Sequence, residues 1–107
     1  MSRGDIVTIV LPGAYGKPRP ALVVQSDLFD ALASVTVLPV TSELRTAPLL
    51  RISIEPNSGN GLRKNSQIMI DKAQTVPRDK LGAAIGRLHE ETLVVVDRAL
   101  AVFFGIA

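Results

Sequence analysis

The chain has 107 residues, which predicts one domain over residues 1–107 with a modest hydrophobic core. Its 47% hydrophobic and 21% charged residues exclude a disordered chain, and the lack of cysteine excludes disulfides, thiolate catalysis and cysteine-ligated zinc. Residues 1–88 carry eleven Lys and Arg against seven Asp and Glu, so the body is basic and suits an anionic partner, although the net charge is only +2.

Short strands separated by turns are predicted in the first part of the chain. They cover residues 5–11, 20–25 and 34–40. One helical turn capped by Ser26 or Asp27 is expected between the second and third strands. Because Pro39 cannot donate a backbone hydrogen bond to a neighbouring strand, the third strand is expected to lie at an edge or to contain a bulge.

The second part of the chain continues with short strands and ends in a helix. The strands are predicted over residues 50–54, 67–71, 75–76 and 83–87. A helix is predicted over 90–104, with Gly105 as its C-terminal stop, and its apolar surface is wide enough to predict burial on two sides, as in a dimer. The predicted fold class is mostly β (α+β), a small antiparallel β-barrel with a long C-terminal helix.

The residue types present exclude several kinds of active site. His89 is the only histidine and is expected to face solvent or cap the helix, so a two-histidine nuclease mechanism is impossible. Carboxylates occur singly in the loops and no phosphate-binding glycine loop is present, so no metal and no cofactor are predicted. The first residues do not resemble a signal peptide and no apolar stretch is long enough to span a membrane, which predicts a cytoplasmic protein without membrane contact.

Two polar features remain as candidates for a site. Arg19 lies between two prolines directly before a buried strand, so a stiff backbone would hold its guanidinium for bidentate contact with a phosphate. Thr41 and Ser42 carry two hydroxyls where a strand opens into a polar loop. From spacing alone, both features are also compatible with a solvated turn and an ordinary capped loop.

Taken in order along the chain, these segments resemble the MazF/PemK (Kid) family of toxins. The resemblance is carried by residues 3–7, 17–26, 38–42, 66–76 and 85–88, and it covers nearly the whole chain. It implies an SH3-like β-barrel with a C-terminal helix, a homodimer, and metal-independent cleavage of single-stranded RNA at short sequence motifs. It also implies a cognate antitoxin whose acidic, disordered tail covers the RNA groove.

The resemblance also implies roles for individual side chains. The essential arginine of the family falls on Arg19, the essential threonine on Thr41, and a carboxylate used by some members on Asp71. The side chains expected to contact RNA are Lys17, Ser42, Ser66 and Lys72. In the expected reaction the ribose 2′-OH attacks the adjacent phosphorus and leaves a 2′,3′-cyclic phosphate and a 5′-OH end. Arg19 would stabilise the developing charge, Thr41 would donate a hydrogen bond to the phosphate or orient the 2′-OH, and Asp71 is the candidate base.

One departure from the family and two rival functions stay open. The loop 12–17 is shorter than in many members and lacks their glutamate, and Tyr15 in it is expected either to stack on a base or to pack on the barrel. The first rival is a gyrase poison of the CcdB kind without enzymatic activity, suggested by the aromatic-Gly-Ile tail over 103–106. The second is a non-catalytic SH3-like module that binds RNA without cutting it.

Overall fold

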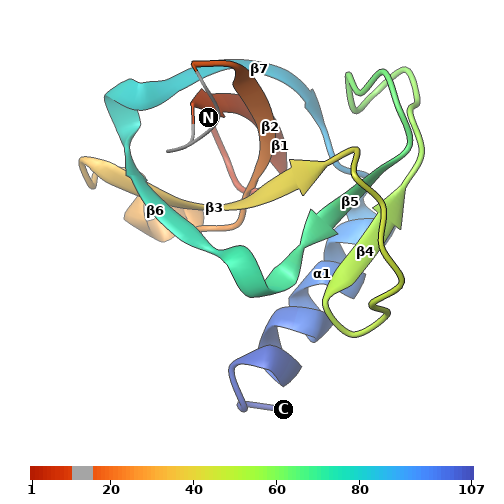
Figure 1. Ribbon diagram of the computed structural model, residues 1–107. Helices are drawn as coiled ribbons and strands as arrows, with labels where there is room; N and C mark the ends of the chain where they lie inside the picture. The colour runs from red at the N-terminus through yellow and green to blue at the C-terminus, as the bar shows by residue number, and fades with distance from the viewer. Residues whose placement is uncertain (11–15) are drawn as a thin grey trace.

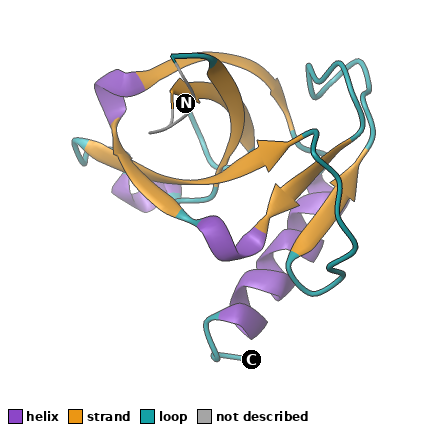
Figure 2. Cartoon of the chain, in the orientation of Figure 1, coloured by secondary structure: helices purple, strands orange, loops and turns teal. Residues whose placement is uncertain are grey.

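The computed structural model describes residues 1–10 and 16–107, and this part of the chain forms seven strands and one long helix (Figure 1, Figure 2). The strands are β1 (Asp5–Val10), β2 (Pro18–Val23), β3 (Ser34–Thr41), β4 (Arg51–Ile54), β5 (Ser66–Met69), β6 (Gln74–Pro77) and β7 (Leu81–Arg87). The helices are the short 3-10 turns η1 (Asp27–Phe29), η2 (Ile70–Lys72) and η3 (Arg78–Lys80), and the C-terminal α1 (Glu90–Phe103). The predicted elements are all found, with bounds that shift by up to two residues; Leu11 and Tyr15 lie outside the described residues.

The strands form one curled antiparallel sheet in the order β4-β5-β3-β2-β1-β7, with β6 paired to β3 beside this path. Figure 1 shows β1, β2, β3, β6 and β7 arranged as a ring, with α1 below it. Within the described residues the ring is not closed by hydrogen bonds, since β6 pairs with β3 and β7 pairs with β1, but β6 and β7 do not pair with each other. The predicted class, a small antiparallel barrel-like sheet with a C-terminal helix, is confirmed, and the barrel is open.

The sheet buries two aliphatic clusters, one on each face. Val7, Ala21 and Val37 belong to the cluster inside the ring, which also contacts residues of β6 and β7. Leu22, Leu38 and other residues of the opposite face pack with Leu93 and Val96 of α1. Successive strand residues point to opposite faces, so neighbours such as Ala21 and Leu22 enter different clusters.

The prediction that the strand with Pro39 lies at an edge is wrong, because β3 pairs with β2 on one side and with β6 and then β5 on the other. Residues 34–37 of β3 pair with β6, and residues 40–41 pair with β5, so Pro39 lies where β3 changes partners. The backbone N–H of Val24 donates to the Thr36 carbonyl at 3.2 Å, so Val24 and Thr36 are a hydrogen-bonded pair. Hydrogen-bonded and non-hydrogen-bonded pairs alternate along antiparallel strands, and in the register of β2 and β3 the nitrogen of Pro39 therefore points away from β2. The missing N–H of Pro39 therefore falls at a gap in the pairing and costs no hydrogen bond.

The helix α1 buries one side and leaves another uncovered. Leu93 and Val96 are buried against the sheet, whereas Val95, Val102 and Phe104 are about half exposed. Phe104, the last residue of the predicted helix, thus does not join the buried side. The homodimer that was inferred from the wide apolar surface stays a prediction. No helix in the described residues is long and apolar enough to cross a membrane.

Gly61 is expected to be far less tolerant of substitution than Gly105, although both have similar positive φ values of 70° and 74°. A Cβ on Gly61 would lie 2.0 Å from the carbonyl oxygen of Ile85 in β7, while a Cβ on Gly105 would meet nothing within 4 Å. Gly61→Ala should therefore lower the free energy of unfolding by about 3 kcal/mol or more. Gly105→Ala should cost only about 1 kcal/mol for the left-handed backbone. Urea unfolding of both variants measures the difference, and equal losses would contradict it.

Candidate active site

Arg19 and Thr41 lie at the same end of the paired strands β2 and β3. The last paired residues at this end are Ala21 and Pro39, and Arg19 and Thr41 each lie two residues further along their strands. Because side chains two residues apart on a strand share a face, both extend the face that carries the inner cluster with Ala21. The pairing register therefore places the two predicted catalytic side chains on one face of the sheet.

The guanidinium of Arg19 makes no hydrogen bond or ion pair with the described part of the chain, and its side chain is exposed. Its backbone pairs with Ile9 of β1, and the flanking Pro18 and Pro20 pair with Val10 and Thr8. The strand pairing and the prolines fix the backbone, while the side chain is exposed. Because the backbone of Arg19 is already fixed, binding of an anion to its guanidinium would cost little backbone conformational entropy.

Thr41 is the last residue of β3, and its hydroxyl holds the start of the following loop. Its Oγ1 accepts a hydrogen bond from the backbone N–H of Glu43 at 3.0 Å. A hydroxyl that accepts in this way still has its own proton to donate. Gln67 of β5 is the residue paired with Thr41, and its buried amide bonds to the backbone of Arg45 in the same loop.

Asp71 lies on η2, the turn that joins β5 to β6. Its Oδ2 is 3.1 Å from the Nζ of Lys72, and its side chain is 22% exposed. Because η2 contacts both β3 and α1, Asp71 is held close to the middle of β3. The ion pair occupies one carboxylate oxygen and leaves the other able to accept a proton or a hydrogen bond. The assignment of Asp71 as the base stays a prediction.

The side chains predicted to contact RNA fall into two groups. Lys17, Ser42 and Lys72 are exposed, as a binding role requires. Ser66 is 5% exposed, and its Oγ donates to the carbonyl oxygen of Lys64 at 2.8 Å. In this structure the Ser66 hydroxyl shapes the loop before β5, so a contact with RNA by this group would require that bond to be exchanged.

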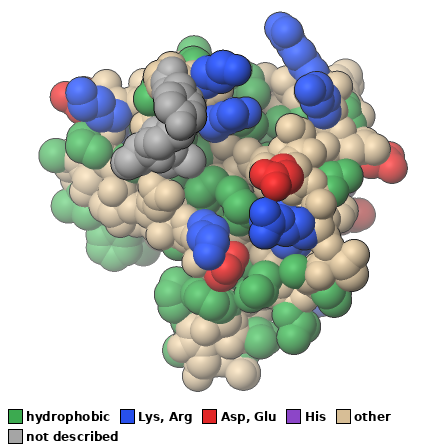
Figure 3. Space-filling model, viewed as in Figure 1, with side chains coloured by type: hydrophobic (Ala, Val, Ile, Leu, Met, Phe, Trp, Pro, Cys, Tyr) green, Lys and Arg blue, Asp and Glu red, His purple; other side chains and the backbone are tan. Residues whose placement is uncertain are grey.

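Figure 3 shows several Lys and Arg side chains on one face of the molecule, with acidic side chains beside some of them. Two of the ion pairs join sequence neighbours, Lys72 with Asp71 and Arg45 with Glu43. Lys17 and Arg19 make no ion pair with the described residues. An anionic ligand on this face would thus meet charges that are not already neutralised.

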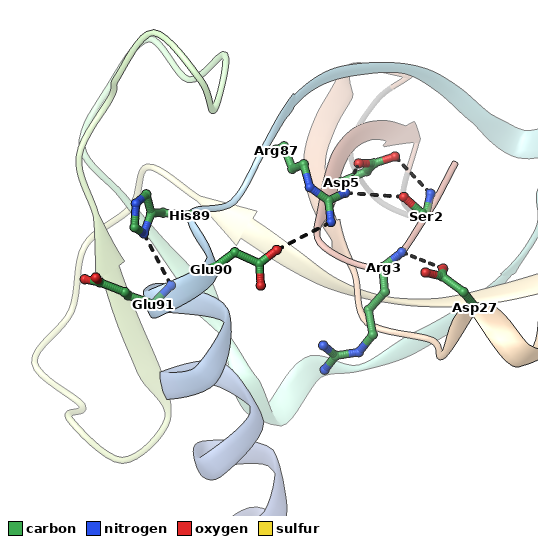
Figure 4. A network of polar contacts seen from close by, with 8 residues as sticks. All are labelled: Ser2, Arg3, Asp5, Asp27, Arg87, His89, Glu90 and Glu91. Atoms are coloured by element: carbon green, nitrogen blue, oxygen red, sulfur yellow. Dashed lines mark hydrogen bonds and ion pairs between the residues drawn. The ribbon is translucent and has the colours of Figure 1, made fainter.

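A second polar network, shown in Figure 4, joins the first residues of the chain to the start of α1. Arg87 donates to Asp5 at 2.6 Å and lies 3.9 Å from Glu90. The Nδ1 of His89 accepts from the backbone N–H of Glu91 at 3.3 Å, which confirms the prediction that His89 is an exposed residue at the helix cap. These contacts stabilise the fold and include none of the predicted site residues.

A surface depression in the described residues also lies away from the predicted site. It has a volume of about 280 Å³ and lies between β4, the loop 55–60 and the start of α1. Its lining contains Asn57, Asn60 and His89 but neither Arg19 nor Thr41. A long polymeric ligand binds across an open surface instead of entering a closed pocket, so a site at Arg19 does not require this depression.

Arg51 and Gln67 were not identified from the sequence, but in the structure both bond to the loop after Thr41. The guanidinium of Arg51 donates both to the Gln67 side chain and to the carbonyl oxygen of Glu43, each at 3.0 Å. The signal in the sequence is an amide directly before the apolar residues Ile68, Met69 and Ile70. Such an amide is expected to be buried, and a buried amide must find hydrogen-bond partners.

The curled sheet, the single C-terminal helix and the exposed cations beside a strand-end threonine define a small, mostly β protein with a cationic surface at the strand ends. Residues 2–104 match the sequence model of the PemK-like, MazF-like toxins of type II toxin-antitoxin systems, and the chain belongs to this family. The family that the sequence segments resemble is thereby confirmed.

Individual relatives agree with this membership. A protein from Mycolicibacterium smegmatis named probable endoribonuclease MazF is 57% identical over 108 residues, covering 100% of this chain and 99% of its own. The Bacillus subtilis endoribonuclease EndoA is 25% identical, covering 99% of this chain and 96% of its own. Among solved structures, Mycobacterium tuberculosis toxin MazF-mt6 superposes with a TM-score of 0.81 at 27% identity, covering 96% of this chain and 98% of that one. A mycobacterial endoribonuclease in complex with its cognate antitoxin has a TM-score of 0.84 at 23% identity, with 100% and 97% covered, and shows the shared fold.

Proposed function

We propose that this protein is the toxin of a type II toxin-antitoxin system and a sequence-specific endoribonuclease that cleaves single-stranded RNA. The observation that carries the proposal is that Arg19 and the Thr41 hydroxyl lie on one face and at one end of β2 and β3. The backbone of Arg19 is fixed by strand pairing, and its guanidinium makes no ion pair with the described residues. It is supported by the 57% identity, over the full chain, to a protein named as a probable endoribonuclease.

The proposed reaction uses the nucleophile that RNA itself carries. The 2′-OH loses its proton and forms a bond to the adjacent phosphorus, the bond to the 5′-oxygen breaks, and that oxygen takes up a proton. The products are a 2′,3′-cyclic phosphate and a 5′-OH end. Arg19 stabilises the charge that grows on the phosphoryl oxygens, because preorganised donors are most effective where charge develops.

Thr41 and Asp71 complete the proposed mechanism. Since the Thr41 oxygen already accepts the Glu43 N–H, its own proton is available to a phosphoryl oxygen or to the 2′-oxygen. Asp71 is proposed to accept the 2′-OH proton. The guanidinium of Arg19 carries N–H donors and no acceptor, so it suits charge stabilisation or proton donation to the leaving oxygen.

The proposed partners follow from the same role. Single-stranded RNA is bound by the exposed Lys17, Ser42 and Lys72, and by Ser66 after rearrangement of its loop bond. The protein acts as a homodimer in the cytoplasm, and a cognate antitoxin with an acidic, disordered tail occupies the same cationic face. The proposed mechanism uses no metal, and within residues 1–10 and 16–107 no three His, Asp or Glu side chains lie together as a ligand set.

End analysis of the cleavage products tests this function. Purified protein is incubated with a long natural RNA in the presence of EDTA, and the ends of the fragments are mapped and characterised. Fragments that share a short motif at the cut, with 5′-OH and 2′,3′-cyclic phosphate ends, are expected. Cleavage that stops with EDTA, or fragments that carry 5′-phosphates, would contradict the mechanism, and intact RNA would contradict the function.

A gyrase poison is the second candidate, because the C-terminal tail is exposed. Phe104 is 59% and Ile106 is 80% exposed, so the aromatic-Gly-Ile tail is accessible to a partner in the single chain. The same protein preparation is therefore incubated with gyrase and supercoiled DNA. Trapped gyrase-cleaved DNA together with intact RNA would favour this candidate, and RNA bound without cleavage would favour a non-catalytic module.

A further inference from the structure

The loop that follows Thr41 is held by the side chain of a single buried residue, Gln67. This residue of β5 is 8% exposed and pairs with Thr41 across the strands. Its Oε1 accepts the backbone N–H of Arg45 at 3.0 Å, and its Nε2 donates to the carbonyl oxygen of Arg45 at 2.9 Å. An amide side chain can donate and accept at the same time, whereas a carboxylate only accepts and an aliphatic side chain does neither.

Arg51 of β4 adds a second connection to the same loop. Its Nη1 donates to Oε1 of Gln67 and to the carbonyl oxygen of Glu43, each at 3.0 Å. The backbone of Glu43 is therefore bonded at both ends, through its carbonyl to Arg51 and through its N–H to the Thr41 hydroxyl. A chain of hydrogen bonds thus runs from the buried amide of Gln67 through Arg51 and Glu43 to Thr41.

This chain of bonds restrains the position of the Thr41 hydroxyl oxygen. The Glu43 N–H occupies one lone pair of Oγ1, which fixes the side-chain rotamer and leaves the proton free to point away from the loop. If the loop moved, the Glu43 N–H would move with it, and the Thr41 oxygen would lose the contact that orients it. Misplacement of a reacting group by about 1 Å can cost about a hundredfold in rate.

We propose that Gln67 and Arg51 are positioning residues of the cleavage reaction, which hold the loop after Thr41 so that the threonine hydroxyl is directed at the phosphate. This inference rests on the proposed ribonuclease function and extends it to two residues that do not touch the RNA. It predicts that changes at Gln67 act on the chemical step through Thr41, and leave RNA binding little changed.

Gln67→Met removes the amide at nearly constant volume, and Gln25→Met is the matched control. The amide of Gln25 also bonds backbone groups, accepting from Thr36 N–H at 3.1 Å and donating to the Ser34 carbonyl at 3.4 Å. Gln25 follows the end of β2 that is opposite to Arg19. Single-turnover cleavage with protein in excess is measured for both variants at a temperature where urea unfolding shows both to be folded. Gln67→Met should lower the rate about tenfold to a hundredfold, and Gln25→Met by less than about twofold.

A double-mutant cycle with Thr41→Val distinguishes positioning from a general structural role. Valine has the shape of threonine without the hydroxyl, so in its presence the orientation of that group no longer matters. The effect of Gln67→Met on the rate should then nearly disappear, because residues that act as a unit are not additive. Equal losses with and without the Thr41 hydroxyl, or equal losses at Gln67 and Gln25, would overturn the inference. A wild-type protein that does not cut RNA would instead overturn the proposed function itself.

Discussion

Arg19→Ala is expected to lower the rate of RNA cleavage by about a hundredfold or more, equivalent to a loss of about 3 kcal/mol of transition-state stabilisation. The side chain is exposed, and its removal breaks no hydrogen bond or ion pair within the described part of the chain. The free energy of unfolding should change by less than about 0.5 kcal/mol. Single-turnover cleavage and urea unfolding of the same preparation measure the two quantities separately.

Two further variants separate the geometry of the guanidinium from its charge. Arg19→Lys keeps the charge but loses the planar fork, so the rate should fall between those of the wild type and Arg19→Ala. Arg98→Ala removes an equal charge from an exposed position on α1 and should cut RNA at nearly the wild-type rate. If Arg98→Ala were as slow as Arg19→Ala, overall charge and not a positioned guanidinium would account for the activity.

The strands were predictable because their signals are local. The aliphatic runs of β1 and β2, the turn residues between them and the capped start of α1 are all contained in a few neighbouring residues. The place of β3 in the sheet was not predictable in this way. A proline within a strand indicates an edge, but η2 leaves a gap in the pairing opposite Pro39, and the residues that create the gap lie about thirty positions away.

The residues of the site also divide into those that local sequence signals identify and those that depend on distant contacts. Arg19 and Thr41 were identified from their positions at strand ends and from the family resemblance, and the pairing register then places them on one face. Gln67 was not identified, because its function depends on two hydrogen bonds to Arg45, a residue that is 22 positions away in the chain. Ser66 illustrates the converse, since its position in a motif does not reveal that its hydroxyl is buried beneath Lys64.

An RNA with a single 2′-deoxy sugar on the 5′ side of the scissile phosphate is expected to resist cleavage at that site altogether. The proposed reaction has no other nucleophile, since Arg19 and Thr41 act on the phosphate and Asp71 only accepts a proton. The loss should exceed that of any single protein variant, because the variants retain the attacking group. Binding should be nearly unchanged, so the modified RNA should compete with unmodified RNA at a similar concentration.

The matched control places the 2′-deoxy sugar one nucleotide to the 3′ side of the cut, where the 2′-OH takes no part in the bond being made. This RNA should be cleaved at nearly the rate of the unmodified strand. Cleavage of both modified RNAs at equal rates would mean that water, and not the 2′-OH, attacks the phosphorus. Arg19 and Thr41 would then have to act in a direct hydrolysis of the phosphodiester. Resistance of the first RNA alone would show that the face with Arg19 and Thr41 accelerates a transfer within the substrate.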